Sequence, residues 1–233
     1  MNRQLPNRRS ASLAGLFLAM GIPIVAAATT NAGDGNLDPN DSVASVLLNE
    51  AFMWGLTLAV LAVVVFWERR PLASIGLVPP SWNAIQVGAG LAMVLLVLAL
   101  VAGTIGQVLG ARIAPGDQDR MVLGLPLWLQ LLVAVSAGFT EEILFRGYAV
   151  ERMMELTGRR WLGAALPVLV FGAVHAPFWG VAHALVAGMS GLWLTIAYLW
   201  RRNLWTNIAA HALLDALVFI AIDMAAIGDM KGA

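Results

Sequence analysis

Residues Ala137–Gly147 read Ala-Gly-Phe-Thr-Glu-Glu-Ile-Leu-Phe-Arg-Gly. This stretch ends an apolar run, residues 121–140, that carries no charged side chain, and it continues into a helix-compatible segment as far as Thr157. We therefore expect Glu141, Glu142 and Arg146 to lie inside a membrane-spanning helix. Ionisable groups are costly there and mark a functional site with partners nearby.

The composition is that of a polytopic membrane protein. Of the 233 residues, 60% are hydrophobic and only 12% are charged, which is about half the charged fraction of an ordinary soluble domain. The hydrophobic residues fall in long runs, as membrane spans do. The net charge of zero gives no indication of a nucleic-acid partner. The absence of cysteine excludes disulfides, thiol nucleophiles and cysteine-based zinc sites.

The hydrophobic runs predict an all-α, polytopic transmembrane helix bundle of about seven spans. The proposed spans are residues 11–30, 46–67, 83–109, 126–157, 161–176, 181–200 and 204–224. We expect the first to be retained, although its basic start and the alanines at 26–28 also fit a cleaved signal peptide, which would leave six spans. With the first span retained, residues 1–44 hold the basic segment, this span and an acidic external loop. Residues 45–233 would form one further domain, with its motifs in residues 137–215.

Basic residues set the expected orientation. With the N-terminus in the cytoplasm and seven crossings, most of the Lys and Arg residues fall on the cytoplasmic side, as the positive-inside rule requires. They are Arg3, Arg8, Arg9, Arg69, Arg70, Arg152, Arg159, Arg160, Arg201 and Arg202. We therefore expect a multi-pass integral protein of a prokaryotic plasma membrane with a cytoplasmic N-terminus.

Helix rise gives the depths of the possible partners of the glutamates. Glu141 is about 24 Å from the basic turn at residues 158–160, and His175 is about 22 Å from the same turn on the next helix. His211 and Asp215 are about 13 and 20 Å from the turn at residues 201–202. All four residues therefore have compatible depths.

The spacing of the first motif separates the two glutamates. Glu142 and Arg146 are four residues apart and share a helix face, so the arginine can hold that carboxylate ionised and fixed. Glu141 points about 100° away from Glu142 and is free to face another helix. Two adjacent carboxylates in a low-dielectric site do not both carry full charge unless cations compensate. One of them is thus suited to proton transfer.

The other two motifs have the same spacing of four residues. Asp215 can orient or hydrogen-bond His211. Phe171 shares a face with His175 and can screen the site from lipid. A lone Glu–Arg pair in a membrane helix is often structural, and a lone histidine such as His183 often only joins two helices. Several such groups at matching depth favour a functional site instead.

The three motifs resemble the signature of the CPBP family of intramembrane peptidases, which includes type II CAAX prenyl proteases and bacteriocin-processing or self-immunity proteins. That signature is Glu-Glu-x-x-x-Arg, Phe-x-x-x-His and His-x-x-x-Asn/Asp. Here its residues are Glu141, Glu142, Arg146, Phe171, His175, His211 and Asp215. The segment at residues 70–77 also resembles one found between early spans of the family.

The resemblance implies a metal-independent endopeptidase without a cofactor. Glu141 would be the general base that activates water, helped by His175, and His211 with Asp215 would stabilise the oxyanion. Glu142, Arg146 and Phe171 would support the site. The third motif often ends in Asn, whose amide donates to an oxyanion. Asp215 donates only when protonated, and otherwise it orients His211.

Three alternatives stay open at the level of sequence. A zinc-dependent membrane metallopeptidase could take ligands from the His and Glu residues, although no His-Glu-x-x-His motif occurs and Arg146 would repel a cation. A proton-coupled transporter could use the same groups as a relay, but it would be expected to have paired repeats. An immunity or scaffold protein could share the fold. The expected partners are the bilayer and a peptide or membrane-protein substrate, possibly lipidated.

Overall fold

The computed structural model describes residues 8–29, 39–108 and 124–232, and these residues form helices and turns without any strand. The order of elements is α1 (Arg8–Leu16), η1 (Phe17–Gly21), α2 (Ile22–Thr29), α3 (Pro39–Ala62), η2 (Val63–Trp67), η3 (Leu72–Ile75), α4 (Trp82–Val108), α6 (Leu127–Glu141), η4 (Glu142–Val150), α7 (Glu151–Thr157), α8 (Arg160–Arg201) and α9 (Leu204–Gly232). The predicted all-α helix bundle is confirmed. Most of the two predicted polar loops, residues 31–44 and 111–124, lies outside the described residues.

Six helical stretches of the described chain are long and apolar enough to cross a membrane. They are residues 8–29, 43–67, 82–101, 127–157, 160–201 and 204–222. The predicted fifth and sixth spans are the two halves of α8, a 42-residue element interrupted at Gly180, where φ is 82° and ψ is 165°. The contact between Gly172 and Gly188 shows that the chain folds back there, since 16 residues of straight helix would separate them by about 24 Å.

The break in α8 is sharper than the predicted one at residues 177–180. The helix continues through Pro177 and ends only at Gly180, because proline keeps a helical φ while glycine alone adopts a positive φ at low cost. The predicted start of the second span is also corrected. Helix α3 begins at Pro39 rather than near Val46, as expected for a proline in the first helical turn.

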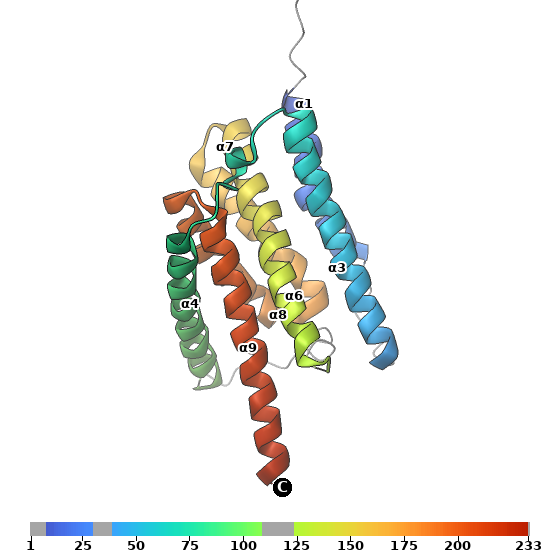
Figure 1. Ribbon diagram of the computed structural model, residues 1–233, viewed down its shortest axis with the longest axis vertical. Helices are drawn as coiled ribbons and strands as arrows, with labels where there is room; N and C mark the ends of the chain where they lie inside the picture. The colour runs from blue at the N-terminus through green and yellow to red at the C-terminus, as the bar shows by residue number, and fades with distance from the viewer. Residues whose placement is uncertain (1–7, 30–38, 109–123, 233) are drawn as a thin grey trace, which may run out of the picture.

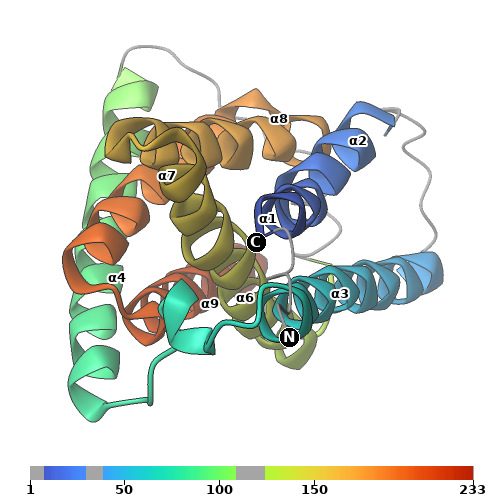
Figure 2. The same cartoon turned by 90° about the horizontal axis from the view of Figure 1, so that it is seen from above.

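The continuous segment α6–η4–α7 runs through the middle of the bundle. Viewed down the long axis, α1–α2 and α3 lie on one side of it and α4 and α9 on the other, with α8 along a third side (Figure 2). Figure 1 shows α3, α6, α9 and α4 side by side along this axis. The motif Glu141–Arg146 therefore lies on the segment that contacts most of the other elements.

Small residues bring α9 close to its neighbours. A Cβ added to Gly138 of α6 would lie 2.8 Å from the Cβ of Ala212, and one added to Gly88 of α4 would lie 2.5 Å from the carbonyl oxygen of Thr206. Such close approaches allow membrane helices to pack without large side chains between them. They fix His211 and Asp215 opposite the end of α6.

The first helix is built into the core. Ala11, Leu16 and Ala19 are buried in the main apolar cluster, and Gly15 lies so close to Tyr148 that an added Cβ would be 2.0 Å from its hydroxyl. In this structure α1 and η1 pack against η4 as an integral part of the bundle.

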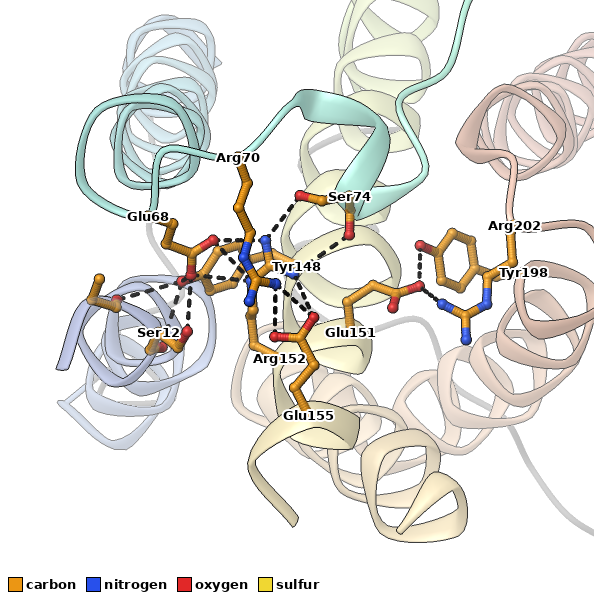
Figure 3. Close-up of polar contacts among 11 residues, drawn as sticks. Ser12, Glu68, Arg70, Ser74, Tyr148, Glu151, Arg152, Glu155, Tyr198 and Arg202 are labelled. Atoms are coloured by element: carbon orange, nitrogen blue, oxygen red, sulfur yellow. Dashed lines mark hydrogen bonds and ion pairs between the residues drawn. The ribbon is translucent and has the colours of Figure 1, made fainter. Parts of the chain in front are cut away.

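Several of the described arginines that were predicted to share one side of the membrane gather at one end of the bundle. Arg70 binds Glu155, Arg152 binds Glu68, and Arg202 binds Glu151. Arg201 donates to Asn83, while Arg8 and Arg9 border the same pocket as Arg70. Figure 3 shows the resulting network between α1, the turn after η2, α7 and the end of α8.

Candidate active site

The two glutamates lie at a change of helix type. Glu141 is the last residue of α6, and Glu142 is the first residue of the π-helix η4. Stretches of π-helix are rare and occur frequently at functional sites. Here the side chain of Glu142 is completely buried, whereas that of Glu141 is 19% exposed and lines a cavity. The two neighbouring carboxylates thus have different surroundings.

Glu142 is held on both of its oxygens. Arg146 Nη1 donates to Oε1 at 2.7 Å, and His211 Nδ1 contacts the same oxygen at 2.9 Å. Asn207 Nδ2 donates to Oε2 at 3.1 Å and to the carbonyl oxygen of Leu194 at 2.8 Å. The pairing of Glu142 with Arg146 that the spacing predicted is present in the structure. Asn207 and His211 of α9 bind the same carboxylate.

His211 has carboxylates on both sides of its ring. Its Nδ1 contacts Glu142, and its Nε2 lies 3.8 Å from Glu141 Oε2 and 3.4 Å from Asp215 Oδ2. A ring protonated on both nitrogens satisfies this arrangement, because each nitrogen can then donate toward a carboxylate. Glu142 orients the imidazole, and Nε2 faces the pair formed by Glu141 and Asp215.

His175 is fixed by aromatic neighbours. Its Nδ1 donates to the carbonyl oxygen of Phe171 at 2.6 Å, and the two ring centroids are 4.7 Å apart. The ring of His183 stacks on His175 at 5.8 Å with 10° between the planes, and Trp179 stacks on His183 at 4.8 Å. Because Nδ1 is engaged, Nε2 is the nitrogen of His175 that is left for other chemistry.

Phe171 joins His175 to the rest of the cluster. The guanidinium carbon of Arg146 lies 4.0 Å from the centroid of the Phe171 ring, and the His211 ring meets the same aromatic edge-on at 6.4 Å. A cation over an aromatic face is stabilised by the negative charge density of the ring. Phe171 therefore separates His175 from Arg146 while it packs against both.

A cavity of 540 Å³ lies between α2, α3, α6, α8 and α9, and Glu141, His175 and His211 face it. Most of its wall is apolar. Its polar and ionisable lining residues are Asn49, Glu50, Thr140, Glu141, His175, His183, Ser190, His211 and Asp215. The volume is in the range of ligand sites that bury a short segment of a chain.

The comparison with protein families gives a match to part of the chain. Residues 123–217 match the family model described as type II CAAX prenyl endopeptidase Rce1-like. The chain carries an Rce1-like domain. This match confirms the resemblance to the CPBP family, and it assigns the domain to a family of CAAX-type membrane proteases. No curated protein and no solved structure matched the chain.

The Rce1-like domain contains every residue singled out by the three motifs. Glu141, Phe171, His175, His211 and Asp215 line the cavity. Glu142 and Arg146 lie behind its wall and support it through His211 and Phe171. His175 contacts Phe171 and His183, and it lines the same cavity as Glu141.

Sequence reasoning missed Asn207 as part of the site. Asn207 is completely buried and joins Glu142 to the backbone of α8. Its signal was its position four residues before His211 and eight before Asp215, which places all three on one stripe of α9. The π-helix and the lining role of Glu50 had no comparable signal in the sequence.

The described residues include no group of three or more His, Asp or Glu side chains placed to hold a metal ion. Glu142 is instead paired with Arg146 and His211, and Glu141 lies 3.8 Å from His211 Nε2. Such a cluster can move a proton between a carboxylate and an imidazole, and it can present N–H donors to a developing negative charge.

Proposed function

We propose that the protein is an intramembrane endopeptidase that hydrolyses a peptide bond with a water molecule activated by Glu141, without a metal ion. One observation carries the proposal. Glu142 is fully buried and bound on both oxygens, whereas Glu141 opens onto the cavity within 3.8 Å of His211 Nε2. Of these two carboxylates, only that of Glu141 is available to a water molecule and a substrate.

The proposed reaction needs few groups. Glu141 accepts a proton from water as the water oxygen attacks the peptide carbonyl carbon. His211 Nε2–H donates to the oxyanion that forms, which stabilises the tetrahedral intermediate. Glu141 then returns the proton to the leaving nitrogen, the C–N bond breaks, and a carboxyl group and an amine are released.

His175 and Asp215 have supporting parts in this proposal. With Nδ1 donated to Phe171, His175 offers Nε2 as an acceptor that orients the attacking water. Asp215, 3.4 Å from His211 Nε2, holds the imidazolium toward the reacting carbonyl. A protonated Asp215 would donate to the oxyanion itself. Asp215→Asn separates these roles, because the amide keeps a donor for the oxyanion but loses the negative charge that holds the imidazolium.

Metal independence is part of the proposal. Arg146 lies 2.7 Å from Glu142, so a divalent cation bound to the glutamates would meet a fixed positive charge. We expect cleavage to survive exhaustive chelation followed by removal of the chelator. Loss of activity that added Zn²⁺ restores would favour the metallopeptidase instead.

The proposed substrate is a peptide or membrane-protein segment, with or without a lipid group, that enters from the bilayer. The arginine-rich end of the bundle is placed in the cytoplasm by the positive-inside rule. A prokaryotic plasma membrane remains the proposed location.

The test compares the wild type with Glu141→Gln, His175→Ala and the matched surface control Glu155→Gln. Cells that produce each variant are profiled by mass spectrometry for the termini of membrane peptides. We expect termini generated by the wild type and by Glu155→Gln to disappear with Glu141→Gln, because removal of a general base slows a reaction about 10²–10⁴-fold. If both site variants process everything that the wild type does, the proposal is wrong.

A further inference from the structure

The cavity extends well beyond the reacting groups, as far as Glu50 on α3. Glu50 lies within the apolar stretch Val43–Trp67 and lines the same cavity as Glu141. The side chains of Ser136 and Asn49 can donate hydrogen bonds to its carboxylate. The hydroxyl of Ser136 also accepts a hydrogen bond of 2.8 Å from Trp54 Nε1, so its own proton is directed toward Glu50. The carboxylate is thereby held in place.

Apart from the imidazolium of His211, the charged groups on the cavity wall are carboxylates. Glu50, Glu141 and Asp215 line the cavity, while no Lys or Arg does so within the described parts of the chain. Ion pairs among the described residues place a cation beside Glu142, Glu68, Glu151 and Glu155, but none beside Glu50. A carboxylate within a membrane span ordinarily has a partner. For Glu50, the open side is the cavity.

We propose that Glu50 determines specificity by binding a Lys or Arg side chain of the substrate. This inference rests on the proposed function. Ser136 and Glu141 are five residues apart on α6, or about 7.5 Å along the axis, and an extended peptide advances about 3.3 Å per residue. For an extended peptide that runs along α6, the basic residue would lie two or three positions from the cleaved bond.

The test uses a set of short synthetic peptides with one apolar sequence, in which a single Lys, Gln or Glu is moved along the chain. Cleavage by the purified protein in detergent is followed by mass spectrometry. We expect kcat/KM to be about tenfold higher for Lys than for Gln two or three positions from the cleaved bond, and lower still for Glu. If the wild-type protein cleaves the Lys, Gln and Glu peptides at equal rates at every position, the inference is wrong.

Variants of Glu50 assign the preference to this side chain. Glu50→Gln and Glu50→Ala should reduce the Lys preference to about twofold or less, and Glu50→Asp should keep most of it, because the carboxylate is retained. The control Glu155→Gln removes a carboxylate at the opposite end of the bundle, and it should leave the preference for Lys unchanged. Charge-free variants at position 50 that keep the full preference would overturn the inference.

Binding separates this inference from the proposed function. The same peptides are titrated onto Glu141→Gln and onto the double variant Glu50→Gln/Glu141→Gln. Tighter binding of the Lys peptide that depends on Glu50, without cleavage by the wild type, would support the cation site and refute the peptidase. Cleavage by the wild type without any effect of Glu50 on binding or rate would support the peptidase and refute the cation site.

Discussion

The central segment α6–η4–α7 carries two buried Glu–Arg clusters that differ in how completely their polar atoms are bound. At the arginine-rich end, Glu68 accepts from Ser12, Tyr148 and Arg152, and Arg152 also donates to Ser74 and Glu155 (Figure 3). At the other, Glu142 is bound by Arg146, Asn207 and His211, but the adjacent Glu141 opens onto a cavity.

This difference separates a structural cluster from a reactive one. Both pairs are fully buried and have similar distances, 2.6 Å for Arg152–Glu68 and 2.7 Å for Arg146–Glu142. Several donors within the bundle compensate the charge of Glu68. This cluster therefore has a structural role, in which it holds α1, η2 and α7 together. The Glu142 cluster keeps one carboxylate and one imidazole nitrogen facing space that a substrate can fill. A buried ion pair alone therefore does not indicate function.

Removal of Arg152 is expected to have the largest effect on stability. Arg152→Ala leaves Glu68 buried without its cation, which costs about 3–5 kcal/mol of unfolding free energy. Thermal unfolding in detergent, with activity normalised to folded protein, measures the two effects separately. We expect a strong loss of stability with the activity per folded molecule retained.

The double variant Glu68→Ala/Arg152→Ala is the control for this prediction. It removes the buried charge together with its partner, so it should be less destabilised than the sum of the two single variants. Strict additivity would contradict a direct coupling between Glu68 and Arg152.

Glu142→Gln should affect activity more than Arg152→Ala does. The substitution removes the negative charge that pairs with Arg146, and it replaces one of the two accepting oxygens by an NH2 donor, so the contacts from Arg146, His211 and Asn207 cannot all be kept. A misplaced His211 is expected to lower kcat about 10²-fold while substrate binding changes little. Steady-state cleavage of one peptide measures kcat and KM separately. A rate equal to that of the wild type would refute the positioning role of Glu142.

Arg70→Ala should have the smallest effect. Arg70 pairs with Glu155 at 2.6 Å, but the Glu155 side chain is 43% exposed, and exposed pairs contribute about 0–1 kcal/mol. We expect a change in unfolding free energy within this range, and a smaller one at high salt because water and ions screen the pair. A loss comparable to that of Arg152→Ala would place Arg70 in the buried network.

The class of the molecule and its motif residues can be predicted without the structure. Long apolar runs predict membrane helices because the hydrocarbon requires about 20 apolar residues per crossing. Spacings of four predicted that Glu142 faces Arg146 and that His211 lies near Asp215, as the structure shows. These predictions succeeded because they depend only on helix periodicity and solvation cost.

The neighbour that each polar group binds depends on how the helices pack. His211 Nδ1 is bound by Glu142 across 69 residues of sequence, Asn207 joins the same carboxylate, and Glu50 shares the cavity with Glu141. Such contacts depend on helix rotation, on the π-helix that follows Glu141 and on the close approach of Gly138 to α9. Periodicity fixes the face of a helix on which a residue lies, whereas packing against other helices fixes what that face meets.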